Sequence, residues 1–460
     1  MHLSALLDFD AVPLDTDDAV SLLLEITAPE RAEDVQRPPS TLQIVLDRSG
    51  SMSGERLDGA VRALLSLVDR LAPSDNFGLV SFNEQARVEV PCGPLTDKAE
   101  VRRRISALRA SGGTDLSSGL LRGAQEARRA SADRGASLVL ISDGRTNQGV
   151  TDSALLRRVA SDAYAHGVTT TTLGYGLGYD EELLGAVADG GAGSALFAED
   201  PDTAGSLIAQ EAEYLLAKTV QAVSLRIPVD PYLRGVGVAG EMPSHQLPDR
   251  SVVVDLGDFH SGEKRRLLLH LDVPGLASLG TTAVTVLEAT YVDPATLTTY
   301  TAALPVTVNV VPGEEAAERT PRPEVRTEEA VQRAQTAKRE ASEALRRGDR
   351  DAAVDTLERA RRDLLDPHTS QAPEAEAAEQ AAELGRMAQM ARSDDASRTS
   401  KALFASQAGH SRKSGRQRPP GTPRQPGEGG GPAVARGRRI RGEQTDKGRP
   451  APDRPSSEGS

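Results

Sequence analysis

The sequence predicts an α/β fold with a doubly wound, mainly parallel sheet, accompanied by a β-sandwich, a helical hairpin and a disordered tail. Two observations predict the first two parts. Between residues 41 and 211, short apolar runs alternate with amphipathic helical patterns, as in right-handed crossovers between parallel strands. From residue 219 to 311, apolar runs are separated only by Pro, Gly and Asp turns, which is typical of a sandwich.

The α/β segment can be divided into strands and helices by its apolar periodicity. In the first helix, Leu57, Val61, Leu64, Leu65 and Val68 share one face. The expected strands cover residues 42–46, 77–82, 138–142, 169–174 and 195–198, and the expected helices cover 56–71, 99–108, 116–130, 151–166 and 181–188.

The segments around this domain have different compositions. Residues 1–38 contain one clear strand, 19–26, with no partner in that segment, so we expect it to pair with the sandwich and to make the α/β domain an insertion. Ala-, Glu- and Arg-rich residues 320–395 predict a helical hairpin around Gly348 and Asp349. One hairpin cannot bury its own apolar face, so we expect it to pack on a neighbour or to self-associate. The predicted regions are 1–38, 39–215, 216–313, 320–395 and 396–460.

Charge and cysteine content restrict the partners and the compartment. The 460 residues carry a net charge of −13, but residues 396–460 hold 14 Lys/Arg against 5 Asp/Glu, which leaves −22 on residues 1–395. The tail is predicted to be basic and disordered, and the acidic body to bind no specific nucleic acid. A single cysteine, Cys92, and the lack of an apolar run of about 18 residues predict a cytoplasmic protein without a membrane span.

Three polar clusters follow predicted strands or precede a predicted helix. They cover residues 47–51, 112–115 and 142–144, and ligands of doubly wound sheets bind at such carboxyl-end loops. Together they offer two carboxylates and three hydroxyls, with neither sulfur nor imidazole. Oxygen ligands of this kind favour Mg²⁺, or Mn²⁺, over softer metals.

The pattern Asp47-x-Ser49-x-Ser51, with Thr114 and Asp143, resembles the metal-ion-dependent adhesion site of von Willebrand factor A domains. The resemblance covers residues 41–213 and includes all five metal positions. It implies that Ser49, Ser51 and Thr114 bind Mg²⁺ directly, and that Asp47 and Asp143 bind it directly or through water. It also implies that an acidic side chain of a protein partner completes the coordination.

Other segments extend the resemblance. Residues 73–82 and 172–176 are similar to the second and the penultimate strand of A domains. Residues 256–263 are similar to a hairpin in bacterial proteins that fuse an A domain to a β-sandwich. Inter-alpha-trypsin-inhibitor heavy chains and calcium-activated-chloride-channel-like proteins share that layout.

The expected function is a protein-interaction module, not an enzyme, that binds Asp or Glu of a partner through the metal. One alternative is an assembly or metallochaperone subunit acting with a separate AAA+ ATPase, because this chain has no P-loop. Another is a metal-dependent hydrolase, although the three loops contain no His to activate Ser49 or Ser51. Residues 174–178 lack the G-x-G-x-x-G spacing of a dinucleotide site.

Overall fold

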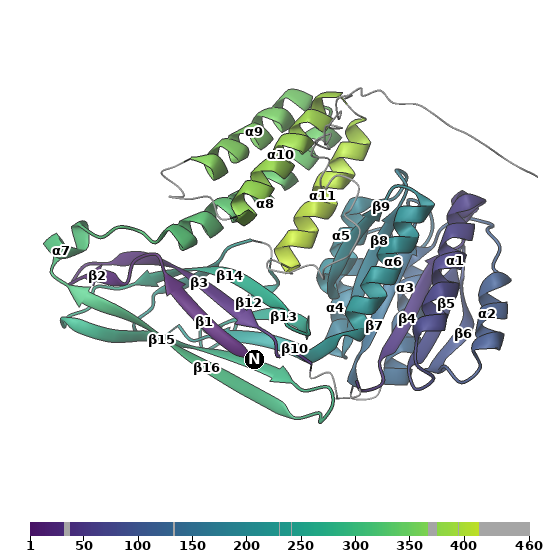
Figure 1. Ribbon diagram of the computed structural model, residues 1–460, viewed down its shortest axis with the longest axis horizontal. Coiled ribbons are helices and arrows are strands. Elements are labelled where there is room, and N and C mark those ends of the chain that lie inside the picture. The colour runs from purple at the N-terminus through teal and green to yellow at the C-terminus, as the bar shows by residue number, and fades with distance from the viewer. Residues whose placement is uncertain are drawn as a thin grey trace, which may run out of the picture.

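The computed structural model describes residues 1–31, 37–131, 134–229, 231–240, 242–366, 375–393 and 395–413. Figure 1 shows a β region on the left, an α/β domain on the right and a group of helices above them. The chain starts in the β region, leaves it to form the α/β domain, returns to complete the β region and continues into the helices.

The α/β domain is built on a six-stranded sheet in the order β6-β5-β4-β7-β8-β9. Every neighbouring pair is parallel except β5 and β6, which confirms the predicted α/β class with a mainly parallel sheet. The strands are β4 (Thr41–Asp47), β5 (Asn76–Phe82), β6 (Ala86–Pro94), β7 (Ala136–Ser142), β8 (Val168–Tyr175) and β9 (Ala192–Ala198).

Helices cover both faces of this sheet, as Figure 1 shows. One apolar cluster joins the sheet to α1, α2 and α6, and a second joins its other face to α3, α4 and α5. The helices are α1 (Glu55–Arg70), α2 (Lys98–Ser106), α3 (Leu116–Ser131), α4 (Ser153–Ala165), α5 (Glu181–Gly190) and α6 (Pro201–Leu216).

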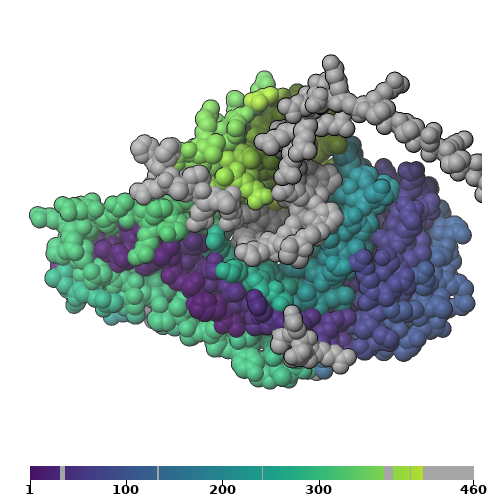
Figure 2. All heavy atoms as spheres, viewed as in Figure 1, coloured from purple at the N-terminus to yellow at the C-terminus, as the bar shows by residue number. Residues whose placement is uncertain are grey.

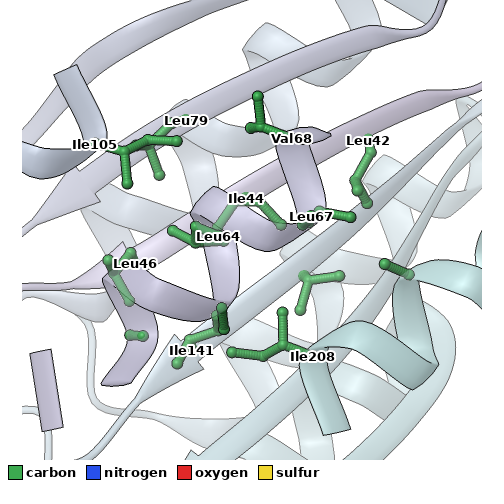
Figure 3. Packing of buried hydrophobic residues seen from close by; sticks show 14 of the residues in the cluster. Leu42, Ile44, Leu46, Leu64, Leu67, Val68, Leu79, Ile105, Ile141 and Ile208 are labelled. Atoms are coloured by element: carbon green, nitrogen blue, oxygen red, sulfur yellow. The ribbon is translucent and has the colours of Figure 1, made fainter. Parts of the chain in front are cut away.

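Strand β4 shows how the sequence directs this packing. Leu42, Ile44 and Leu46 point to the α1 side, where Figure 3 shows them around Leu64. Val45, between them, belongs to the cluster on the α3 side. Because side chains alternate along a strand and both faces are covered, all seven residues of β4 are buried, including Asp47 at its end.

The β region contains two sheets that share one apolar core. Their strand orders are β1-β3-β14-β11 and β12-β13-β10-β15-β16-β2. The strands are β1 (His2–Leu7), β2 (Ala11–Pro13), β3 (Asp18–Thr27), β10 (Lys218–Ile227), β11 (Gly235–Val238), β12 (Ser244–Gln246), β13 (Val252–His260), β14 (Lys264–Val273), β15 (Gly280–Val292) and β16 (Thr299–Val311).

Strand β3 corresponds to the strand expected at 19–26, and it pairs with β14 over its whole length. Its other neighbour is β1, so the expectation of no partner within residues 1–38 was wrong. The sequence did not predict β1, because the strand is short and lacks a regular apolar alternation.

The last region is larger than the expected hairpin. It contains α7 (Gly313–Ala317), α8 (Pro323–Arg346), α9 (Arg350–Leu365), α10 (Ala375–Ser393) and α11 (Ala396–Lys413). One apolar cluster contains residues from each of the helices α8 to α11, among them Ala334, Leu357, Leu384 and Leu403. The apolar face of the hairpin α8–α9 is thus covered by the chain's own helices, which removes the reason given for self-association.

The predicted boundary of the disordered tail at residue 396 was also wrong. Helix α11 begins at Ala396, and Thr399, Lys401 and Leu403 are buried. The composition predicted disorder because α11 contains only two large apolar residues, Leu403 and Phe404. Residues 414–460, the rest of the predicted tail, lie outside the described residues.

Helices α8 and α11 connect the bundle of α8 to α11 to the rest of the molecule. Helix α8 contacts β3 and β14, whereas α11 contacts β9 and α5 of the α/β domain. In the space-filling view of Figure 2, the bundle lies above both regions. No helix within the described ranges is long and apolar enough to cross a membrane.

Candidate metal centre

The predicted site lies where β4 and β7 end side by side. Asp47 is the last residue of β4, and Asp143 directly follows β7, its parallel neighbour. The chain runs from β4 to β5 on one side of β4 and later returns to β7 on the other side. The two carboxylates therefore flank the topological switch point, where doubly wound folds bind their ligands.

Backbone hydrogen bonds fix the loop that follows β4. Ser111 N donates to Arg48 O at 2.8 Å, and Gly50 N donates to Gly112 O at 3.0 Å. Gly112 has a φ of +79°, a conformation that other residues adopt only with strain. Two of the three predicted polar clusters are in this way joined through their backbones.

Asp47 is completely buried, and each of its carboxylate oxygens accepts one hydrogen bond. Oδ1 accepts from Ser49 N at 2.8 Å, and Oδ2 accepts from Ser142 Oγ at 2.7 Å. Burial raises the pKa of Asp47, and the nearby Asp143 adds to this effect, whereas the bonds from Ser142 and Ser49 oppose it. A buried carboxylate of this kind gains from a cation in its vicinity.

A chain of hydroxyls connects Ser49 to Asp143. Ser51 Oγ donates to Asp143 Oδ1 at 2.7 Å, and Ser49 Oγ lies 3.0 Å from Ser51 Oγ. The two serine hydroxyls and the Asp143 carboxylate thus form one continuous series of polar contacts. Ser49 and Asp143 are buried and Ser51 is exposed, so the site opens to solvent at Ser51.

Thr114 precedes α3 and is held through its backbone. Its N–H donates to Asn147 Oδ1 at 2.9 Å, and its carbonyl accepts from Asn147 N at 3.1 Å and Gln148 N at 3.2 Å. Its side chain is buried, yet the Thr114 hydroxyl has no hydrogen bond to any residue that the structure describes. The hydroxyl is therefore available to a ligand or to water.

Gly144 shows that two of these hydroxyls converge. A Cβ atom at Gly144 would lie 3.3 Å from Ser51 Oγ and 3.8 Å from Thr114 Oγ1. The structure therefore brings Asp47, Ser49, Ser51 and Asp143 together through hydrogen bonds, and it places Thr114 next to Ser51 across Gly144.

Two further residues of the site were not among the predicted site residues. Ser142 belongs to the third polar cluster, but no role was assigned to it. Arg56, in the first turn of α1, donates from Nη1 to Asp143 Oδ2 at 2.6 Å. No sequence signal indicates this contact, because Arg56 lies 87 residues from Asp143 and looks like an ordinary polar residue of an amphipathic helix.

The donor set fits a hard divalent cation. It consists of two carboxylates and three hydroxyls around the space beside Gly144, all of them oxygen ligands suited to Mg²⁺ or Mn²⁺. Within the described ranges, this site included, no group of three or more His, Cys, Asp or Glu is placed to hold a metal ion. The candidate site therefore depends on its three hydroxyls as well as on Asp47 and Asp143.

The comparisons with known proteins identify the family. Residues 42–210 match the von Willebrand factor type A domain. The chain is also 31% identical over 303 residues to the uncharacterized protein sll0103 of Synechocystis sp., a match that covers 62% of this chain and 70% of that protein. The chain belongs to the von Willebrand factor type A domain family. This confirms the predicted resemblance.

Other relatives of the A domain agree with this assignment. The uncharacterized protein YfbK of Escherichia coli is 28% identical over 277 residues; the match covers 58% of this chain and 48%, about half, of that protein. The inter-alpha-trypsin inhibitor heavy chain H2 of Mus musculus is 27% identical over 166 residues, which cover 34% of this chain and 17% of that protein.

Two solved structures resemble most of the chain. The von Willebrand factor type A protein from Catenulispora acidiphila has a TM-score of 0.68 at 19% identity, covering 89% of this chain and 96% of that one. The ArnB paralog VWA2 from Sulfolobus acidocaldarius has a TM-score of 0.61 at 14% identity, covering 89% and 98%. At such low identity these likenesses show the fold, which extends here beyond the A domain itself.

Proposed function

We propose that the A domain is a metal-dependent protein-interaction module. Proteins with A domains typically mediate metal-dependent protein interactions and are generally not enzymes. In this proposal Mg²⁺, or Mn²⁺, is held by Asp47, Ser49, Ser51, Thr114 and Asp143. The bound ion supplies a Lewis-acid position for an Asp or Glu side chain of a partner protein.

The observation that carries the proposal is the convergence of the Ser51 and Thr114 hydroxyls beside Gly144. The backbone of Thr114 is held by Asn147, and its hydroxyl makes no hydrogen bond to any residue that the structure describes, so it can bind a ligand. A carboxylate pair alone would not require a hydroxyl in that place. A cation shared with Ser51 and Asp143 explains why this loop places Thr114 there.

The chain's own residues provide the rest of the binding step. Ser142 and the backbone of Ser49 hold the Asp47 carboxylate in one orientation, while Ser51 orients Asp143. Neutral hydroxyls leave most of the positive charge on the ion, which favours an anionic ligand from outside. The exposed position of Ser51 gives that ligand access.

The compartment is part of the proposal. Cys92 is buried, and burial raises the pKa of its thiol to about 12, so it is not a reactive thiolate. Because the sequence contains one cysteine, it can form no internal disulfide that an oxidising compartment would stabilise. We therefore propose a cytoplasmic location.

The metal site is tested by calorimetric titration of the full chain with Mg²⁺. We expect weak binding of one ion by the wild type and none by Asp143→Asn, whose side chain keeps the same shape. Glu84→Gln is the matched control, because Glu84 is an exposed carboxylate near Gly113 that is not part of the proposed site. Equal Mg²⁺ affinity in wild type and Asp143→Asn would contradict the proposal.

The interaction is tested by affinity capture with the immobilised full chain, followed by mass spectrometry. Partners should be retained in Mg²⁺, released by EDTA and absent with Asp143→Asn. A partner retained equally in EDTA and by the variant binds another surface of the molecule.

A further inference from the structure

A basic side chain contacts a carboxylate of the proposed metal site. Arg56 Nη1 lies 2.6 Å from Asp143 Oδ2 and 3.4 Å from Ser51 O. Asp143 is completely buried, whereas 40% of the Arg56 side chain is exposed. The guanidinium thus covers one oxygen of Asp143 from the solvent side, while Ser51 bonds the other oxygen.

The helix dipole by itself disfavours a cation at Arg56, so the neighbouring carboxylates, above all Asp143, stabilise the guanidinium there. Arg56 is the second residue of α1, where the helix dipole favours negative charge, and the same turn contains Glu55 and Asp58. The guanidinium also packs closely on a loop: a Cβ at Gly176 would lie only 3.1 Å from Arg56 Nη2. Gly176 has a φ of +75°, which also disfavours a larger residue.

The charges at the site make Arg56 and a divalent ion competitors. Asp47 and Asp143 carry two negative charges when ionised, and Arg56 already neutralises one of them. A divalent ion between the same carboxylates would experience repulsion from the guanidinium, which partial exposure to solvent weakens but does not abolish.

We propose that Arg56 regulates the metal site. Its guanidinium pairs with the Asp143 carboxylate in the metal-free protein, and its positive charge lowers the affinity of the site for the divalent ion. The inference rests on the proposed metal site and adds its regulation. Arg56 stabilises the metal-free form by pairing a buried carboxylate, so metal binding has to displace or repel this guanidinium. The site then binds metal reversibly instead of holding it permanently.

The test is a titration of the full chain with Mn²⁺, in which the electron paramagnetic resonance signal reports the free ion. We expect Arg56→Gln to bind Mn²⁺ about five- to tenfold more tightly than the wild type, because the repulsion is removed. Arg56→Lys retains the charge and should stay within about twofold of the wild type.

Arg145→Gln is the matched control. Arg145 is exposed, lies two residues from Asp143 and forms no ion pair with any residue that the structure describes. Its removal changes the net charge equally without touching Asp143, so we expect at most a twofold change at physiological salt.

Thermal unfolding gives a second readout that does not depend on affinity measurements. Without metal, Arg56→Gln should melt below the wild type, because Asp143 loses its cationic partner, and Mn²⁺ should raise its Tm more than that of the wild type. Weaker or unchanged Mn²⁺ binding in Arg56→Gln, with normal binding by the wild type, would overturn the role of Arg56 alone. Absence of Mn²⁺ binding in both proteins would overturn the proposed metal site as well.

Discussion

Gly144 determines how much space lies between the hydroxyls of the site. It follows Asp143 directly, and its φ is not in the left-handed region, so alanine can adopt its backbone conformation. A methyl group there would lie 3.3 Å from Ser51 Oγ, closer than ordinary van der Waals contact, and would occupy part of the space that a cation needs. The space needed beside the hydroxyls, and not a special backbone conformation, therefore accounts for glycine at position 144.

We predict that Gly144→Ala folds normally and loses about tenfold or more in Mg²⁺ affinity, since ligands that shift by a few tenths of an ångström no longer suit octahedral Mg²⁺. Calorimetry measures the affinity and urea unfolding measures the stability. Gly50→Ala is the control: its Cβ would make only an ordinary 3.5 Å contact with Gly112 O in the same group of loops. Equal Mg²⁺ affinity in the two variants would argue against a cation beside Gly144.

At the scale of elements, α11 is attached to the α/β domain by a buried lysine. Lys401 is 2% exposed; its ammonium group donates to Tyr179 O at 2.8 Å, pairs with Glu181 and lies 4.3 Å from the centre of the Tyr179 ring. Phe404 packs so closely on α5 that a Cβ at Gly185 would lie 2.3 Å from its ring. Helix α11 thus behaves as an integral element of the fold.

We predict that Lys401→Met destabilises the protein by about 1–3 kcal/mol, because Glu181 then keeps only Arg346, at 3.8 Å, as a cationic partner. Hydrogen exchange should rise in α11 and α5, and urea unfolding measures the loss. Arg398→Ala is the control, since its ion pair with Glu199 is partly exposed and is worth about 0–1 kcal/mol. If Lys401→Met and Arg398→Ala were equally stable, the attachment of α11 would depend on apolar contacts alone.

The elements also show what the sequence could and could not predict. The β4 strand and the Asp47-x-Ser49-x-Ser51 pattern were predictable because periodicity and spacing are local properties of the chain. Arg56 and Lys401 were not, because each acts on a carboxylate far away in sequence, Asp143 and Glu181 respectively. Partners of this kind depend on how elements pack together, and no local pattern records them.

At the scale of the whole molecule, a buried ionic group joins the β region to the α/β domain. Glu263, between β13 and β14, accepts hydrogen bonds from Tyr214 Oη in α6 at 2.9 Å and from Arg265 Nε at 2.9 Å. His260 makes two further contacts with Glu263 Oε2: its backbone N–H donates at 2.9 Å, and its Nδ1 lies at 2.9 Å. Because Tyr214 belongs to the α/β domain and the other groups to the β region, this cluster fixes the junction of the two.

The cluster makes the junction sensitive to acid. Burial by itself would raise the pKa of Glu263, but Arg265 and His260 outweigh burial and hold that pKa well below its ordinary value. A carboxyl group with a lowered folded-state pKa stabilises the fold above its unfolded pKa of about 4.3, and this contribution is lost as the pH falls below that value.

We therefore predict that acid weakens the wild type more than Glu263→Gln. At pH 7 the variant should be less stable by about 3–5 kcal/mol, since Arg265 keeps its buried charge without the carboxylate. Between pH 5 and about pH 3 its free energy of unfolding should fall less steeply than that of the wild type, because it lacks the group that takes up the proton. Urea unfolding at a series of pH values measures both slopes.

Glu288→Gln is the control. It removes a carboxylate that is paired with Arg226 at the surface, and it should retain the wild-type slope. Parallel slopes for the wild type and Glu263→Gln would show that the junction does not account for the acid sensitivity.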